Sequence, residues 1–132
     1  MPAKFQLREQ QVIAFVATSD PDRAKTFYRD TLGLRLVFEE IPFALVFDAN
    51  GIMLRVSIVK KLSPAAFTVL GWQVSNIKAA AKTLTKAGVQ FARYPGMQQD
   101  ELGIWNSPNG AKVAWFKDPD GNTLSISERP RA

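Results

Sequence analysis

Apolar and polar positions recur in the same order twice along this chain. An apolar run at residues 12–17 is followed by helical spacing over 21–32, and then by shorter apolar runs at 34–39, 43–47 and 52–59. Short runs rich in β-branched and aromatic residues predict strands, whereas apolar positions three and four residues apart predict an amphipathic helix. The first half is therefore predicted to form a strand, a helix and three further strands.

The second half repeats this order after residues 60–67, which we interpret as a linker. Its predicted elements are a strand at 69–74, a helix after Asn76, a strand at 89–93, a longer loop at 94–100, and the segments 102–106, 111–116 and 123–127. The signals at the ends of the elements also correspond, because an Asp or Asn begins each helix, a Gly ends it, and a Gly lies in each hairpin turn. The corresponding pairs are Asp20 and Asn76, Gly33 and Gly88, and Gly51 and Gly121.

This repeat predicts how the two halves assemble. Each half would form a curved antiparallel sheet with one helix on its outer face, and neither half can bury its other face alone. We therefore predict an α+β fold in which two βαβββ modules form curved antiparallel sheets around a central cavity. The chain is predicted to be a single domain over 1–132, with module one at about 11–59, the linker at 60–67 and module two at about 68–128. The alternative is an unrelated α+β sandwich whose repeat is coincidental.

The composition limits the chemistry. The 132 residues are 46% apolar and 22% charged, which is typical of a soluble globular domain. They include no cysteine and no histidine, which excludes disulfides, thiolate metal sites and a histidine base. The first residues lack the apolar segment of a signal peptide, and no apolar run approaches the ~18 residues of a membrane span. We therefore expect a cytoplasmic protein with no membrane partner.

The net charge of +5 does not indicate a nucleic-acid-binding protein. Lysine and arginine residues are spread along the chain among acidic residues. A nucleic-acid-binding module would concentrate them on one helix or strip. We therefore expect no nucleic-acid partner.

Two motifs resemble a known family. The segments DPDRAKTFYRDTLGL at 20–34 and FKDPDGN at 116–122 resemble the vicinal oxygen chelate superfamily. That superfamily includes glyoxalase I, bleomycin-resistance proteins, fosfomycin-resistance enzymes and extradiol dioxygenases. The resemblance covers roughly residues 11–128 and is specific for the fold, but it is weak for the reaction because the family supports many chemistries and some simple binders.

The resemblance also implies four positions for a divalent metal. In metal-dependent members, His or Glu ligands lie on the first and last strands of both modules. The matching positions here are Ile13, Arg55, Val69 and Ser125. Two alkyl chains, a guanidinium and a hydroxyl do not provide the donors that a divalent ion needs. We therefore expect no metal and no cofactor.

Strand alternation extends this set of positions into a candidate binding surface. Residues two apart on a strand share a face, so the face would be mostly apolar, with one cation, an amide and hydroxyls. Trp105, next to residues 96–100, is interpreted as a pocket lip or as a packed side chain. The candidate ligand-binding residues are Ile13, Phe15, Arg55, Val69, Gln73, Trp105 and Ser125.

Arg55 and two tryptophans have alternative or structural roles. Arg55 could anchor a carboxylate or phosphate, or it could form a salt bridge with Asp48, Glu39 or Glu40. Trp72 and Trp115 are both predicted to lie in the core.

The function that these observations favour is the metal-independent binding of a small hydrophobic or anionic molecule. The alternative is a lyase-like or isomerase-like enzyme that uses Arg55, or a metal held by carboxylates outside the four positions, so no catalytic residue is assigned. A regulatory partner bound at the basic surface is a third hypothesis. We expect assembly as a homodimer.

Overall fold

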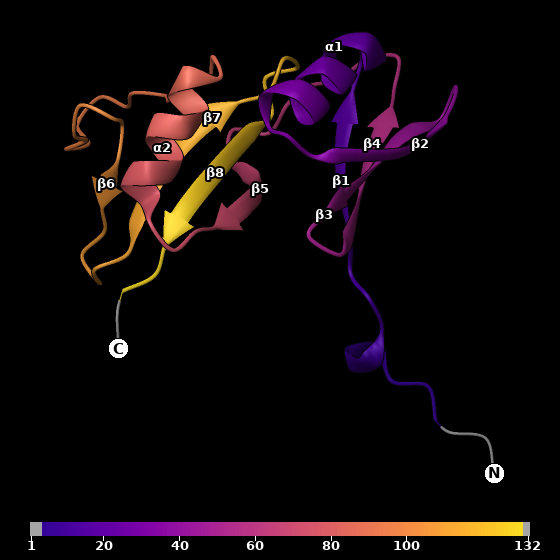
Figure 1. Cartoon of the computed structure of the whole chain (residues 1–132), viewed down its shortest axis with the longest axis horizontal. Helices are drawn as coiled ribbons and strands as arrows, with labels where there is room; N and C mark the ends of the chain where they lie inside the picture. The colour runs from indigo at the N-terminus through magenta and orange to yellow at the C-terminus, as the bar shows by residue number, and fades with distance from the viewer. Residues whose placement is uncertain (1–3, 131–132) are drawn as a thin grey trace.

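The computed structural model describes residues 4–130 of the single domain expected over 1–132. A 3-10 turn, η1 (Leu7–Glu9), precedes module one, which contains a four-stranded sheet in the order β1-β4-β3-β2 (Figure 1). The elements of module one are β1 (Ile13–Thr18), α1 (Pro21–Lys25), the π-helix η2 that continues it (Thr26–Thr31), β2 (Arg35–Glu40), β3 (Ala44–Ala49) and β4 (Ile52–Ile58).

Module two contains the second four-stranded sheet, in the equivalent order β5-β8-β7-β6. Its elements are β5 (Thr68–Gln73), α2 (Ile77–Lys86), β6 (Trp105–Asn106), β7 (Lys112–Lys117) and β8 (Thr123–Glu128). The α+β fold with two repeated modules is therefore confirmed. No helix in the described part of the chain is long and apolar enough to cross a membrane.

Local sequence determines where the helices begin and end. The side chain of Asp20 accepts a hydrogen bond from the backbone N–H of Arg23, and Asn76 caps α2 in the same way through Ala79. These contacts satisfy amide groups that have no partner inside a helix. Gly33 follows the first helix with a φ of 77°, a left-handed conformation that glycine adopts without steric cost.

Both sheets are mixed, whereas the sequence predicted antiparallel sheets. Strand β1 runs parallel to β4, and β5 runs parallel to β8. The connections explain the parallel pairs. Each helix runs back alongside the sheet, so the next strand starts at the same end of the sheet as the first strand. After two further hairpins, the last strand runs in the direction of the first.

The strand predicted at 89–93 is wrong. In this segment Phe91 forms only an isolated bridge with Phe116, and the edge position of the sheet is taken partly by the short β6. The following loop is held by hydrogen bonds to a side chain and not by pairing of backbone groups between strands. The side-chain amide of Gln99 donates to the carbonyl oxygens of Ala92 and Gly103 and accepts from the N–H of Tyr94. Apolar side chains at 89–93 therefore pack against the core without forming a regular strand.

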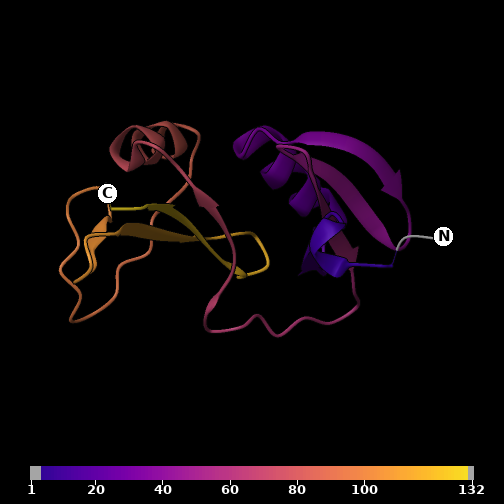
Figure 2. The same cartoon turned by 90° about the horizontal axis from the view of Figure 1, so that it is seen from below.

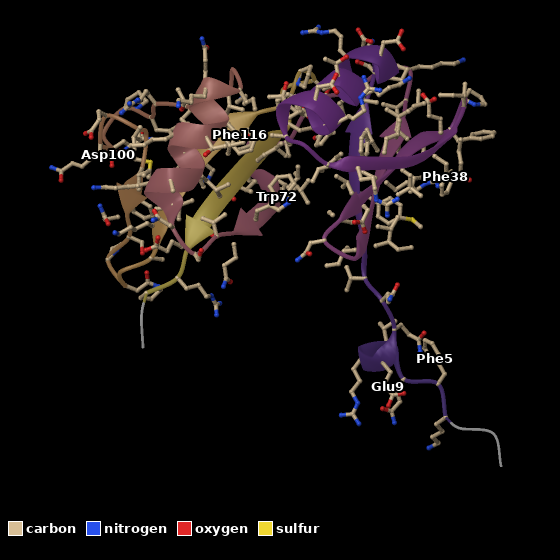
Figure 3. The ribbon with its side chains drawn as sticks, viewed as in Figure 1. Phe5, Glu9, Phe38, Trp72, Asp100 and Phe116 are labelled. Atoms are coloured by element: carbon tan, nitrogen blue, oxygen red, sulfur yellow. The ribbon has the colours of Figure 1, made fainter. Side chains whose placement is uncertain are left out.

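The two modules share one apolar core on the helix side of the sheets. Tyr28, Phe47 and Leu54 from module one and Phe116 and Leu124 from module two are fully buried in a single cluster. Figure 3 shows Phe116 at the boundary between the modules. The helix-bearing faces of the two sheets are therefore covered within the chain.

The turn at 118–122 links the modules through polar contacts. Asp118 accepts a hydrogen bond from the buried Tyr28 of module one, and Asp120 accepts one from the hydroxyl of Thr18 at 2.6 Å. This turn, which the sequence suggested only as a hairpin, therefore fixes one sheet relative to the other.

Nothing within residues 4–130 covers the opposite faces of the two sheets, and we call them the open faces. Figures 1 and 2 show the two sheets lying side by side, each with its own helix. Ile13 is 46% exposed and Phe15 is 58% exposed on the open face of module one, and Val69 is exposed in module two. The sheets therefore do not close around the central cavity that the sequence predicted.

Candidate ligand-binding site

The predicted site residues fall into two groups, one on each open face. In module one, Phe15 on β1 lies directly opposite Arg55 on β4, and Ile13 lies two residues earlier on the same face. In module two, Ser125 on β8 lies opposite Gly71 on β5. The structure thus brings Phe15 and Arg55 together in module one, whereas in module two the strand neighbours of Ser125 are Gly71 and Trp115, which are not among the predicted ligand-binding residues.

The two groups meet at a groove near the linker. This groove has a volume of about 340 Å³ and is lined by Phe15, Ser57, Val69, Asn122 and the linker segment 62–65. Val69 lies where the pairing of β5 with β8 shifts register, so its side chain is displaced from a regular ladder position. The groove is the place where side chains predicted from both modules approach each other.

Arg55 forms an ion pair with Glu40 of β2 on the open face of module one. Of the alternatives for Arg55, the structure therefore shows the internal salt bridge. Both side chains remain partly exposed, so the guanidinium keeps donors that face solvent. The sequence offered Glu40 as one of three acidic candidates, and the pairing of β2 with β3, which puts Glu40 opposite Ala44, selects it.

Ser125 is largely buried although it lies on an open face. A methyl group added at Gly71 would lie 2.6 Å from the Ser125 hydroxyl oxygen. Gly71 therefore leaves just enough space for the serine side chain beneath the edge strand. Glu128, three residues later, faces the helix side, where it accepts a hydrogen bond from the N–H of Ile77.

Three aromatic side chains form a cluster on the open face of module two. The rings of Trp105 and Trp115 lie 5.9 Å apart, and Tyr94 meets Trp115 edge-on at 5.6 Å. The Trp115 indole also donates a hydrogen bond to Thr68. The prediction that Trp115 lies in the core is wrong, because Trp115 is opposite Ser125 in the sheet register.

The register of that hairpin could have been read from the sequence. The turn at 118–122 pairs Lys117 with Thr123. Moving two residues away from the turn along each strand pairs Trp115 with Ser125. The alternating neighbours Ala114 and Phe116 are the buried ones.

A second groove lies on the helix side of module two. It has a volume of about 450 Å³, and its wall is mostly apolar, with contributions from Leu32, Trp72, Ala80 and Leu84. Trp72 packs beneath α2 as predicted. Gln73 lines this groove too, so the end of β5 reaches both surfaces.

The side chains at the four family positions do not fit a divalent metal. Ser125 contributes the one oxygen among them, Ile13 and Val69 contribute none, and Arg55 carries a positive charge. A divalent ion needs several N, O or S donors around it. Within residues 4–130, no group of three or more Asp and Glu side chains is close enough to hold a metal ion elsewhere.

The sequence matches one family model over most of its length. Residues 10–126 match the Glyoxalase/Bleomycin resistance protein/Dioxygenase superfamily. The chain belongs to this superfamily. No protein with a curated description matches the sequence.

Solved structures of superfamily members share the fold. Lactoylglutathione lyase from Agrobacterium tumefaciens superposes with a TM-score of 0.69 at 16% identity, covering 91% of this chain and 93% of that one. The glyoxalase family protein from Enterococcus faecalis gives 0.69 at 21% identity, covering 92% and 98%. The glyoxalase/bleomycin resistance protein from Catenulispora acidiphila DSM 44928 gives 0.68 at 21% identity, covering 91% and 98%. These similarities establish the fold of this superfamily member. Its chemistry has to be inferred from its own side chains.

The arrangement is suited to binding. It offers apolar side chains on both open faces, an aromatic cluster, a hydroxyl at Ser125 and the Arg55 guanidinium with donors that face solvent. Ligand sites combine these features, with an apolar wall and a few polar groups that orient the ligand.

Proposed function

We propose that this superfamily member is a metal-independent protein that binds a small hydrophobic or anionic molecule and works as a homodimer. The observation that carries the proposal is the chemistry of the four family positions, where no side chain is a metal ligand of the usual kind. The ligand would contact the open faces at Ile13, Phe15, Arg55, Val69, Gln73, Trp105 and Ser125.

The homodimer follows from the exposure of these faces. Protein sites commonly bury 70–90% of a small ligand's surface, and an open face in one chain cannot do so. A second copy that covers the open faces would provide the missing wall. It would also remove from water the apolar side chains that one chain leaves exposed.

The test of metal independence is metal analysis of protein purified without added metal, followed by thermal unfolding with Zn²⁺, Ni²⁺, Mn²⁺ and Fe²⁺. We expect less than stoichiometric metal and no stabilisation by any of the four ions. An ion bound tightly to the folded state would add about 2.7 kcal/mol at a hundredfold excess over its dissociation constant. One ion bound per chain would contradict the proposal.

An enzymatic alternative is favoured by the Arg55–Glu40 pair. Arg55 would hydrogen-bond a substrate carbonyl oxygen, while Glu40 would take the proton from the neighbouring carbon and leave the electron pair on that oxygen. S-lactoylglutathione, the compound in the name of the Agrobacterium tumefaciens structure, has such a proton.

Exchange of this proton with deuterated solvent, followed by NMR, tests the alternative. Exchange that disappears in both Arg55→Met and Glu40→Gln, but persists in the exposed control Arg35→Met, would establish the enzyme. We expect no exchange above the buffer rate.

A further inference from the structure

The groove on the helix side of module two lies where the two modules meet. Leu32 and Leu34, which lead from the first helix into β2, line it from module one, and α2 lines it from module two. Phe116 and Ile126, both buried, form its base. Figure 3 shows Trp72, another lining residue, near Phe116 on the side of module two that faces module one. The groove is therefore built by both halves of the chain, behind the open face of module two.

The size and the lining of the groove suit a small molecule without charge. Its volume of about 450 Å³ falls within the range of about 300–1,000 Å³ that is common for ligand sites. None of the described residues that line it is charged, and the lysines of α2 (Lys78, Lys82 and Lys86) are exposed outside it. A charged ligand would lose its hydration here and find no counter-charge, which is unfavourable. The groove therefore favours neutral molecules.

The apolar side chains of the groove are recessed. None of the large apolar side chains that are exposed in the described part of the chain lines it. Exposed apolar patches mark contacts between proteins, whereas concave apolar sites take small ligands. This difference favours a small molecule over a second copy or a peptide as the occupant.

The indole N–H of Trp72 is a hydrogen-bond donor that has no protein partner within residues 4–130. By contrast, the indole N–H of Trp115 donates to the hydroxyl of Thr68. No fully buried nitrogen or oxygen of a described side chain lacks a partner, so water reaches the N–H of Trp72. Tryptophans that are buried usually bond this group, and Trp72 lines the groove. A ligand with an oxygen acceptor would replace that water and be oriented by the bond.

We propose that this groove binds a small neutral molecule with an aromatic or alicyclic body between α2 and Leu32. A carbonyl or ether oxygen of the ligand accepts a hydrogen bond from the indole N–H of Trp72. The site goes beyond the proposed function, because it lies behind the open face and does not use Arg55. The ligand contacts both modules, so it binds the folded chain and stabilises it by mass action.

The tryptophans make the site visible by NMR, because each indole N–H gives a separate signal. Trp72 reports on the groove, whereas Trp105 and Trp115 belong to the aromatic cluster on the open face. The probe is 6-propionyl-2-(dimethylamino)naphthalene, a neutral aromatic ketone, and Trp72→Phe assigns the signal. We expect the probe to shift the signal of Trp72 and to leave the other two unchanged.

Two variants of α2 test where the probe binds. Ala79→Trp places an indole inside the groove and should weaken binding of the probe at least about tenfold. Thr85→Trp, at an exposed position of α2 that does not line the groove, adds the same side chain outside it and should leave binding unchanged. Fluorescence titration of the probe gives the dissociation constant of each variant.

The hydrogen bond to the ligand has its own test. Trp72→Phe keeps an aromatic ring but removes the donor. It should therefore weaken binding of the ketone probe about fivefold more than binding of 2-(dimethylamino)naphthalene, which lacks the ketone. Trp115→Phe is the control and should change the affinities of the two probes by the same factor. Equal weakening of both probes in Trp72→Phe would overturn the role of Trp72 as the donor.

The outcomes separate this site from the open faces. Shifts of the Trp105 and Trp115 signals with an unchanged Trp72 signal would place the probe on the open face and overturn the proposal. Unchanged binding in Ala79→Trp, or no binding to the wild type, would overturn it as well.

Sedimentation tests the other occupant of the groove. Self-association that weakens in Ala79→Trp but not in Thr85→Trp would assign the groove to a second copy and overturn the proposal. Because the open-face site is tested at Arg55, the two proposals can fail independently.

Discussion

The hydroxyl of Tyr28 donates a hydrogen bond of 2.7 Å to the carboxylate of Asp118, joining the first helix of module one to the last hairpin of module two. Both side chains are buried. Asp118 also accepts hydrogen bonds from the backbone N–H groups of Asp120 and Asn122. One carboxylate thus shapes the hairpin turn and attaches it to the other module.

Replacing Tyr28 by Phe should change how stability depends on pH. Burial, followed by the negative charge of Asp118, raises the pKa of Tyr28 above its ordinary value near 10. The folded protein therefore holds this proton more tightly than the unfolded chain does. The stabilisation is complete below about pH 10 and is lost as the pH rises further.

We expect Tyr28→Phe to be less stable than wild type by about 1–3 kcal/mol at pH 7. Above pH 10 the wild type should lose about 1.4 kcal/mol per pH unit relative to the variant. Urea unfolding of both proteins from pH 7 to 11 measures the difference. A difference that stays constant over this range would contradict the assignment.

Asp120 supports the same junction from the other end of the turn. Its carboxylate accepts hydrogen bonds from the Thr18 hydroxyl and from the backbone and hydroxyl of Ser19. Asp120→Ala should lower the free energy of unfolding by about 1–3 kcal/mol, since charged acceptors form the stronger bonds.

The matched control is Asp48→Ala in the equivalent hairpin of module one. There the carboxylate bonds the N–H of Gly51 in its own turn, and the loss should be below about 1 kcal/mol. Urea unfolding of both variants is the measurement. An equal decrease in the free energy of unfolding in the two variants would contradict a special contribution of Asp120 to the contact between the modules.

Much of the fold was predictable because its signals are local. Asp20 and Asn76 cap their helices, and Asn50-Gly51 turns a two-residue hairpin with positive φ at both residues. The segment 89–93 resembles a strand by composition, yet a strand also requires a neighbour with free backbone groups. The neighbouring β7 forms only a bridge with Phe91 and pairs with β6 instead.

The candidate site was predictable in part, for a related reason. Strand alternation predicted that Ile13, Arg55 and Ser125 line a central cavity, and in the structure the register places them on the open faces. It could not show that the faces remain open within one chain, because that depends on how the modules pack. The Arg55–Glu40 pair forms across β3, between β4 and β2. Which of the nearby acidic side chains reaches Arg55 depends on the register of these strands, and local sequence patterns do not determine that register.

Gly71→Ala tests the close packing between β5 and β8. The new methyl group would lie 2.6 Å from the Ser125 hydroxyl oxygen, and overpacking of this kind costs about 1–3 kcal/mol. With Ser125→Ala in the same chain, the nearest atom becomes the Ser125 backbone oxygen at 3.4 Å. The double variant should therefore recover most of the loss.

Urea unfolding of the four proteins gives the coupling energy directly. Equal destabilisation in Gly71→Ala with and without Ser125→Ala would show that the hydroxyl is not the obstacle. Ser125→Ala alone is the matched control.

Arg55 provides the sharpest prediction about the ligand. The probe is 1-anilinonaphthalene-8-sulfonate, which combines an aromatic surface with one anionic group, and its comparison is neutral 1-anilinonaphthalene. If the solvent-facing donors of Arg55 hold the sulfonate, Arg55→Met should weaken binding of the charged probe about tenfold, equivalent to about 1.4 kcal/mol. The neutral probe should bind both proteins equally.

Glu40→Gln should have the opposite effect on the charged probe. This substitution removes the negative charge beside Arg55 and frees its guanidinium, so the charged probe should bind more tightly than to wild type. Arg35→Met, at the exposed start of β2, controls for net charge. Fluorescence titration of each protein with both probes is the measurement, and equal weakening in Arg35→Met and Arg55→Met would place the anion on the general surface instead of at Arg55.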